Sequence, residues 1–372
     1  MTNNLKWYFG PSAAEKHGPN DSITTTFKGD KYYSLAREVL QNSIDAIDDE
    51  TKPVKVAFSF FELEKSEMES FWSLRNNLES CQNYFFSHET FKKFCELGKR
   101  QFDNGKIKCL KISDLNTSGL EYSDGTESKF FGFMESVGVT NKSNAGSGGS
   151  FGFGKGAYYA ASTIRTIVVS SIYGNDSRIF QGKARLTTHK DDNGELKDYT
   201  GLFGLENGKP VTDLELIPTI FKRKEKGTDI IIMGFHDTED WEKSLVKSVL
   251  NNFWLAIWEE KLIVDIEGTV IDKDRLEGII STFYNENSGD GNVNEPETWN
   301  PYPYFKAVKF IDDINTKFYE DELETLGKVK LYLYLQDGLP SRTIYLRSPK
   351  MVVYKRMLKR GFDYAEVNNS FH

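Results

Sequence analysis

Eleven residues near the middle of the chain constrain its fold most strongly, because six of them are glycine. Residues 146–156 read Gly-Ser-Gly-Gly-Ser-Phe-Gly-Phe-Gly-Lys-Gly. Glycine at this density lets the backbone adopt positive φ angles and approach a ligand closely. Phe151 and Phe153 lie within the run and an apolar stretch follows it, whereas a flexible linker is polar throughout. We therefore predict a ligand-binding glycine loop that leads into a helix at residues 156–161.

The same run excludes one common phosphate-binding motif. Gly149, Gly154 and Lys155 have the spacing of a P-loop, but Gly156 stands where that motif needs Ser or Thr to hold Mg²⁺. The residues before Gly149 are polar, whereas a P-loop follows a strand. The free N–H groups of the predicted helix still favour an anion, and Lys155 adds a positive charge.

A second constraint is a polar stripe on a predicted helix. Apolar residues recur at helical spacing over residues 32–49. Glu38, Asn42 and Asp45 stand at positions i, i+4 and i+7, so they share the opposite face of the helix. A carboxylate and an amide one turn apart can hold a water molecule and a hard cation such as Mg²⁺, which prefers oxygen ligands. The solvated face of an ordinary amphipathic helix explains this pattern equally well.

Two weaker patterns place polar side chains at strand ends. Asp114 follows a predicted strand at 107–112, and its carboxylate would accept a hydrogen bond from an amine such as the amino group of adenine. A simple Asx turn explains the same residues. Thr228 stands before a predicted strand at 229–234, where its hydroxyl would bond adenine or a water beside Asp114. Because β-branched residues are common in strands, the Thr228 pattern is weak by itself.

In their order and character, these four segments resemble the GHKL ATPase superfamily. Its members include gyrase B subunits, ninety-kilodalton heat-shock chaperones, MutL and MORC proteins and sensor histidine kinases. The first motif of that family, Glu-x3-Asn-x2-Asp-Ala, is matched by residues 38–46. The second, Asp-x-Gly-x-Gly, is matched loosely: Asp114 and Gly119 are present, but Asn116 replaces the first glycine and one extra residue precedes the last. The glycine run matches the third motif, and Gly-Thr at 227–228 matches the fourth.

The resemblance implies a role for each matched residue. Glu38 would be the general base that activates the attacking water, Asn42 would ligate Mg²⁺, and Asp45 would order nearby waters. Asp114 would bind the adenine amino group with help from Thr228, and glycine N–H groups would cradle the phosphates. Residues 138–143 also resemble the segment before the lid in MutL and MORC proteins. The implied nucleotide contacts are Asn42, Asp45, Asp114, Asn116, Gly119, Lys142, Gly149, Gly152, Gly154, Lys155, Gly156 and Thr228.

The resemblance also implies how the chain is divided. It predicts an N-terminal arm at 1–27, a two-layer α/β sandwich of the Bergerat type at 28–236, and a smaller transducer-like α/β domain at 237–372. In the family, a lysine of the second domain reaches the γ-phosphate. Lys350, with Lys330 behind it, is the candidate here, although an ordinary surface lysine is the commoner role.

Composition limits the function classes. The formal net charge of −8 argues against bulk nucleic-acid binding and leaves only local basic patches or partners for such contacts. The three cysteines are widely spaced, which disfavours a structural zinc site and fits a reducing compartment. The N-terminus is polar and no run of about 18 apolar residues occurs. We therefore expect a cytoplasmic chain that does not span a membrane.

These observations predict Mg²⁺-dependent ATP binding and hydrolysis. Closure of a mobile lid at 121–150 would then drive a conformational change or homodimerisation, in a setting such as a bacterial defence or DNA-processing complex. The aromatic residues 7–9 of the arm would anchor a second protomer or pack on their own domain. The alternative is an ATP-binding regulatory or scaffold module with little turnover. A histidine kinase is disfavoured because only His17 precedes the site, where no helix is predicted.

Overall fold

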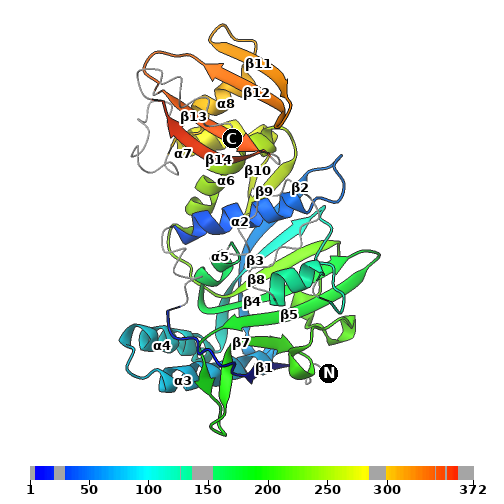
Figure 1. The fold of residues 1–372 in the computed structure, drawn as a ribbon, viewed down its shortest axis with the longest axis vertical. Coiled ribbons are helices and arrows are strands. Elements are labelled where there is room, and N and C mark those ends of the chain that lie inside the picture. Colours follow the sequence, from blue (N-terminus) through cyan, green and yellow to red (C-terminus); the bar gives the residue numbers. More distant parts are fainter. Residues whose placement is uncertain are drawn as a thin grey trace. The chain divides into compact units, whose positions relative to one another are not determined.

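The chain forms two compact units in the computed structural model (Figure 1). Unit 1 comprises Met1–Ser248 and Glu260–Ile271, and unit 2 comprises Val249–Glu259 and Asp272–His372. The structure describes residues 5–20, 30–125, 127–135, 154–284, 299–339, 341–347 and 350–358. Within these ranges, no helix combines the length and apolarity needed to cross a membrane.

Over the described residues, unit 1 is built on a ten-stranded mixed sheet in the order β1-β7-β5-β4-β8-β3-β2-β9-β10, with β6 paired to β7. The β2–β9 pair is parallel, and the pairs from β1 through β2 are antiparallel. The sequence pattern predicts strands at 54–63, 107–112, 163–172, 178–185 and 229–234 in one sheet, and the corresponding strands do share one sheet. The strands are β1 (Lys6–Pro11), β2 (Val54–Glu64), β3 (Lys106–Leu115), β4 (Ser162–Tyr173), β5 (Ser177–Arg185), β6 (His189–Lys190), β7 (Leu196–Gly204), β8 (Gly227–Phe235), β9 (Leu262–Ile266) and β10 (Thr269–Ile271).

Two predictions about this sheet are wrong. Residues 6–11 are an edge strand paired with β7 rather than part of an arm, and the Trp7 ring packs 5.3 Å from the rings of Phe71 and Phe203. The aromatic cluster thus packs on its own unit. Residues 262–271 belong to the same sheet, because β9 pairs with β2, and not to the second domain. Local periodicity identifies a strand but does not say which sheet it joins.

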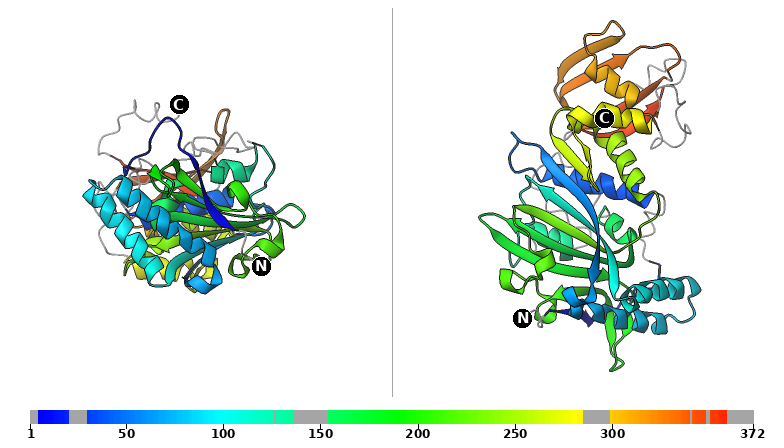
Figure 2. Two further views of the ribbon diagram at one scale, coloured as in Figure 1. Left: turned by 90° about the horizontal axis from the view of Figure 1, so that it is seen from below. Right: turned by 180° about the vertical axis from the view of Figure 1, so that it is seen from behind.

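Both faces of the sheet are covered. One face, here called the packing face, carries Cys109, Val168 and Met233, which belong to an apolar cluster with α3 (Leu74–Tyr84) and α4 (Glu89–Asp103). Successive side chains alternate between faces, so Asp114 and Thr228 point to the opposite side, here called the site face. The predicted α/β class is confirmed, but helices on both faces replace the predicted two-layer arrangement (Figure 2).

The site face lies against α2 (Lys31–Asp45) and α5 (Gly156–Ala160). The helix α2 begins at Asp30, whose carboxylate accepts the N–H groups of Tyr32 and Tyr33 at 3.0 Å each. Its apolar stripe is buried, which leaves Glu38 and Asn42 on a half-buried polar side. The short π-helix η3 (Phe131–Glu135) also contacts this face. The 3₁₀ turns are η1 (Lys65–Glu67), η2 (Glu69–Ser73), η4 (Glu206–Gly208), η5 (Leu214–Leu216) and η6 (Thr219–Phe221).

Unit 2 is a smaller α/β body. It contains the last residues of α6 (Trp241–Trp258), then α7 (Lys273–Phe283), α8 (Tyr302–Lys309) and the hairpins β11 (Thr316–Leu323)–β12 (Gly327–Tyr334) and β13 (Arg342–Arg347)–β14 (Met351–Met357). Both lysines considered for the γ-phosphate pair with carboxylates of unit 2. Lys350 Nζ lies 3.4 Å from Glu259, and Lys330 Nζ lies 3.5 Å from Glu320.

Candidate functional site

The carboxylate of Glu38 lies between α2 and the end of the glycine run. Asn42 Nδ2 donates to Glu38 Oε1 at 2.9 Å, which fixes the orientation of both side chains. Gly154 packs so closely on this carboxylate that a Cβ at that position would overlap it, so any larger residue there would displace the Glu38 side chain. Tyr158 of α5 is buried nearby, and burial together with the charge of Glu38 raises the pKa of its hydroxyl. The hydroxyl therefore stays neutral beside Glu38.

Asp114 joins three elements at the end of β3. Its carboxylate accepts hydrogen bonds from Ser43 Oγ of α2 at 3.3 Å, from Thr117 Oγ1 at 2.6 Å and from the Thr228 N–H at 2.7 Å. Burial raises the pKa of the Asp114 carboxyl, while the bonds from Thr117 and Thr228 oppose that shift. The first, second and fourth sequence motifs therefore meet at one carboxylate.

Close backbone packing explains two of the predicted glycines. Gly119 has φ +72° and a Cβ there would collide with the carbonyl oxygen of Ile172, and Gly227 has φ +130° and lies against Asp114. Ser171 connects the two segments. Its Oγ accepts the Leu120 N–H at 2.9 Å, donates to the Gly227 carbonyl at 2.8 Å and lies 3.1 Å from Thr228 Oγ1.

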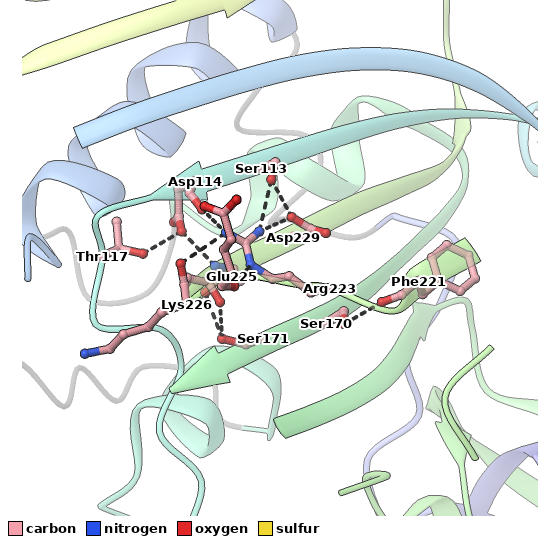
Figure 3. Close-up of polar contacts among 12 residues, drawn as sticks. Ser113, Asp114, Thr117, Ser170, Ser171, Phe221, Arg223, Glu225, Lys226 and Asp229 are labelled. Atoms are coloured by element: carbon pink, nitrogen blue, oxygen red, sulfur yellow. Dashed lines mark hydrogen bonds and ion pairs between the residues drawn. The ribbon is translucent and has the colours of Figure 1, made fainter. Parts of the chain in front are cut away.

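Arg223 is a buried residue of this region that the sequence analysis missed (Figure 3). Its guanidinium forms an ion pair with Asp229 and donates to the Asp114 carbonyl, to Ser113 Oγ at 3.0 Å and to the Glu225 carbonyl at 2.7 Å. Arg223 thereby holds the ends of β3 and β8 together behind Asp114. The sequence feature that could have indicated Arg223 is Asp229. An acidic residue near the start of an apolar strand needs a buried partner.

Two predicted contact residues have other surroundings. The Asn116 side chain donates to the carbonyls of Asp49 and Lys52 at 2.9 Å each, and it accepts the Asp49 N–H at 3.1 Å. Asn116 therefore secures the turn after α2, and its role as a nucleotide contact stays a prediction. Asp45 is an exposed residue at the last position of α2. Lys142, Gly149 and Gly152 lie outside the described residues.

Positive charge collects at the other end of the site. Lys155, which precedes α5, donates to the Gly132 carbonyl, and Lys183 of β5 donates to the Met134 carbonyl. Burial lowers the pKa of Lys155 to about 8 and that of Lys183 to about 7. Arg185 lies over the rings of Tyr159 and Tyr199, 5.6 and 5.4 Å from their centroids. Lys155 was predicted from the sequence as a site residue. Nothing in the sequence of β5 distinguished Lys183 and Arg185 from ordinary surface residues of a strand.

The residues of this site would suit a Mg²⁺ ion that takes some of its oxygen ligands from a bound molecule. Among the described residues, no group of three or more His, Cys, Asp or Glu side chains could hold a metal ion by itself. Asn42 uses its Nδ2 to bond Glu38, so its Oδ1 is the atom that would bind a cation. Mg²⁺ commonly takes one or two protein oxygens and completes its shell with phosphates and water.

No protein-family profile matches this sequence, and no curated protein matches it either. The chemistry of the site must therefore be argued from its geometry. A buried acceptor, Asp114, lies at one end, and a carboxylate–amide pair beside buried cations lies at the other. Such a site suits a ligand with an amine at one end and an anionic group at the other.

Proposed function

We propose that unit 1 binds ATP with Mg²⁺ at the site face and hydrolyses it with Glu38 as general base. The observation that carries the proposal is the shared carboxylate of Asp114. It accepts bonds from α2 and from the start of β8, while Asn42, one residue before Ser43, bonds Glu38. Segments far apart in the sequence, which the GHKL resemblance selects independently, thus meet at one place.

Each end of the site would have its own task. At the adenine end, Asp114 accepts a hydrogen bond from the exocyclic amine, and the Thr228 and Ser171 hydroxyls lie within reach of a ring nitrogen or a water. At the phosphate end, Asn42 would hold Mg²⁺, and the ion would supply positive charge that neutralises the phosphates. Glu38 accepts a proton from a water molecule. At the same time the oxygen of that water bonds the γ-phosphorus, and the bond between the γ-phosphorus and the β,γ-bridging oxygen breaks. ADP and phosphate then leave.

The close contact between Gly154 and Glu38 supports a second candidate function. The glycine backbone packs against one side of the half-buried Glu38 carboxylate, so movement of this segment would change how water and a ligand approach Glu38. Turnover would therefore be coupled to a conformational change, with lid closure or homodimerisation as its output. If the segment stays in place, the chain is an ATP-binding regulatory or scaffold module with little turnover.

Phosphate release at saturating ATP and Mg²⁺ separates these possibilities. Glu38→Ala should keep ATP binding but lower turnover by roughly 10²–10⁴-fold, the usual size of a general-base contribution. Glu50→Ala, which removes an exposed carboxylate just beyond α2, is the matched control and should behave like the wild type. ATP binding without wild-type turnover would favour the regulatory module. Equal turnover in wild type and Glu38→Ala would exclude Glu38 as the base.

A further inference from the structure

Three cations on the site face are buried close to one another. Lys183 and Arg185 stand two residues apart on β5, so their side chains point to the same face, and the two residues are only 5% and 6% exposed. Lys155 faces them from the start of α5. Mutual repulsion among these cations contributes to the lowered pKa of Lys183, after burial itself. Buried cations are energetically unfavourable unless something compensates them.

Acidic residues lie beside both lysines of this cluster. Among the described residues, the carboxylates acting on the two lysines are Glu38, beside Lys155, and Glu135, beside Lys183. Lys155 and Lys183 also donate to carbonyls of η3, and Arg185 lies over aromatic rings. The cluster is thus arranged around carbonyl dipoles and rings, which an anion could displace or supplement.

We propose that Lys155, Lys183 and Arg185 form a phosphate subsite beside Glu38. This inference rests on the proposed function for its preferred ligand, the terminal phosphate of ATP, but the same chemistry would bind free inorganic phosphate or polyphosphate. Lys183 and Arg185 extend the site to β5. This strand contains neither the glycine run nor any of the motifs from which the sequence predicts the site. On binding, the lysines exchange carbonyl oxygens of η3 for phosphate oxygens, which are stronger partners because they are charged.

Lys183→Met tests the subsite, because Met keeps the length of the buried side chain and removes its charge. Affinity for ATP should fall by about tenfold or more, as expected for a lost charge-assisted hydrogen bond, while affinity for ADP changes less. The ligand-free variant should stay folded, because removal of the buried charge offsets the lost bond to the Met134 carbonyl. Lys190→Met, at the exposed position of β6, is the matched control and should change neither affinity.

Proton uptake gives a second readout that needs no variant. A phosphate bound near Lys155 and Lys183 favours their charged forms, so binding at pH 8 should take up protons in wild type. Calorimetry in two buffers of different ionisation enthalpy measures this uptake, which should decrease in Lys183→Met. Zero uptake in wild type, or an unchanged ratio of ATP to ADP affinity in a folded Lys183→Met, would overturn the subsite while leaving ATP binding intact.

Tripolyphosphate separates this inference from the proposed function. If tripolyphosphate and inorganic phosphate bind with proton uptake but ATP binds no more tightly than tripolyphosphate, the subsite stands and the nucleotide site falls. If neither phosphate nor ATP binds, the subsite is overturned together with the proposed function. A marked loss of thermal stability in ligand-free Lys183→Met, with both nucleotide affinities unchanged, would show that Lys183 only secures η3.

Discussion

The two faces of the large sheet are formed by the same strands but differ in the side chains that they bury. On the packing face, burial raises the pKa of Cys81 to about 11 and keeps its thiol neutral among Leu, Ile and Phe side chains. On the site face, the strands β3, β5 and β8 carry Asp114, Lys183 and Thr228. One face therefore contributes stability through apolar contact, and the other holds charges in surroundings that do not favour them.

This contrast between the faces indicates that the binding site lies on the site face. Buried ionisable groups that are stabilised only in part are expected at binding sites, because a ligand can supply the missing compensation. Arg223 connects the two faces, since it pairs with Asp229 on the packing side and donates to the backbone of Asp114. Substitutions should accordingly fall into three groups. The first affects both stability and ATP binding, the second affects stability alone, and the third affects ATP binding alone.

Arg223→Met should have the broadest effect. It leaves the Asp229 carboxylate buried without its ion-pair partner, so the free energy of unfolding should fall by about 3–5 kcal/mol. Because Arg223 also positions Asp114, ATP affinity should fall as well. Urea unfolding and nucleotide titration measure the two effects. The double variant Arg223→Met/Asp229→Asn should recover part of the lost stability, and a single variant as stable as wild type would show that the ion pair does not hold these strands together.

Phe180→Ala should affect stability alone. Phe180 is fully buried on the packing face, with its ring centroid 5.7 Å from that of Phe221. Removing an aromatic ring from a packed core lowers the free energy of unfolding by about 3–5 kcal/mol. ATP affinity, measured well below the melting temperature, should stay within about twofold of the wild-type value, since additivity holds for distant sites. A large loss of affinity in the folded variant would contradict the separation between the faces.

Asp114→Asn should weaken nucleotide binding by about 1–3 kcal/mol, because the amide presents a donor or a weaker acceptor to the adenine amine. The pH dependence gives a linked test. Burial raises the pKa of Asp114, so this carboxyl takes up its proton at a higher pH than an ordinary carboxyl does. As the pH is lowered, the wild-type affinity for ATP should therefore begin to fall at this higher pH. Asp114→Asn should lack this component. Identical pH profiles for the two proteins would exclude Asp114 as the adenine acceptor.

The sequence predicted most elements but not their assembly. Alternation and helical spacing located β2, β4, β5, β8 and α2 to within a few residues, because those signals are local. The continuous run Ile230–Ile232 was a sign that the sheet is buried on both faces, but it does not show which helices cover them. The position of β1 at the sheet edge depends on pairing with β7, nearly 200 residues away, which no local pattern encodes.

The candidate site was predictable where its chemistry lies in short motifs. Glu38, Asn42, Asp114 and Thr228 were identified because each belongs to a recognisable segment. Arg223, by contrast, stands in a charged run, 222–226, that resembles any exposed turn, and only the fold shows that its guanidinium is buried. Lys183 and Arg185 were missed for the same reason, since their partners come from η3 and α5.

Amide hydrogen exchange with and without Mg²⁺ and ATP reports both whether ATP binds and where it binds. If ATP binds the site face, saturating ATP should slow exchange in peptides covering residues 38–46, 113–120, 154–160 and 225–229. Peptides of α3 and α4, on the packing face, should exchange as before. Unchanged exchange in all four site-face segments at millimolar ATP, or protection confined to other parts of the chain, would contradict the assignment of a nucleotide site to this face.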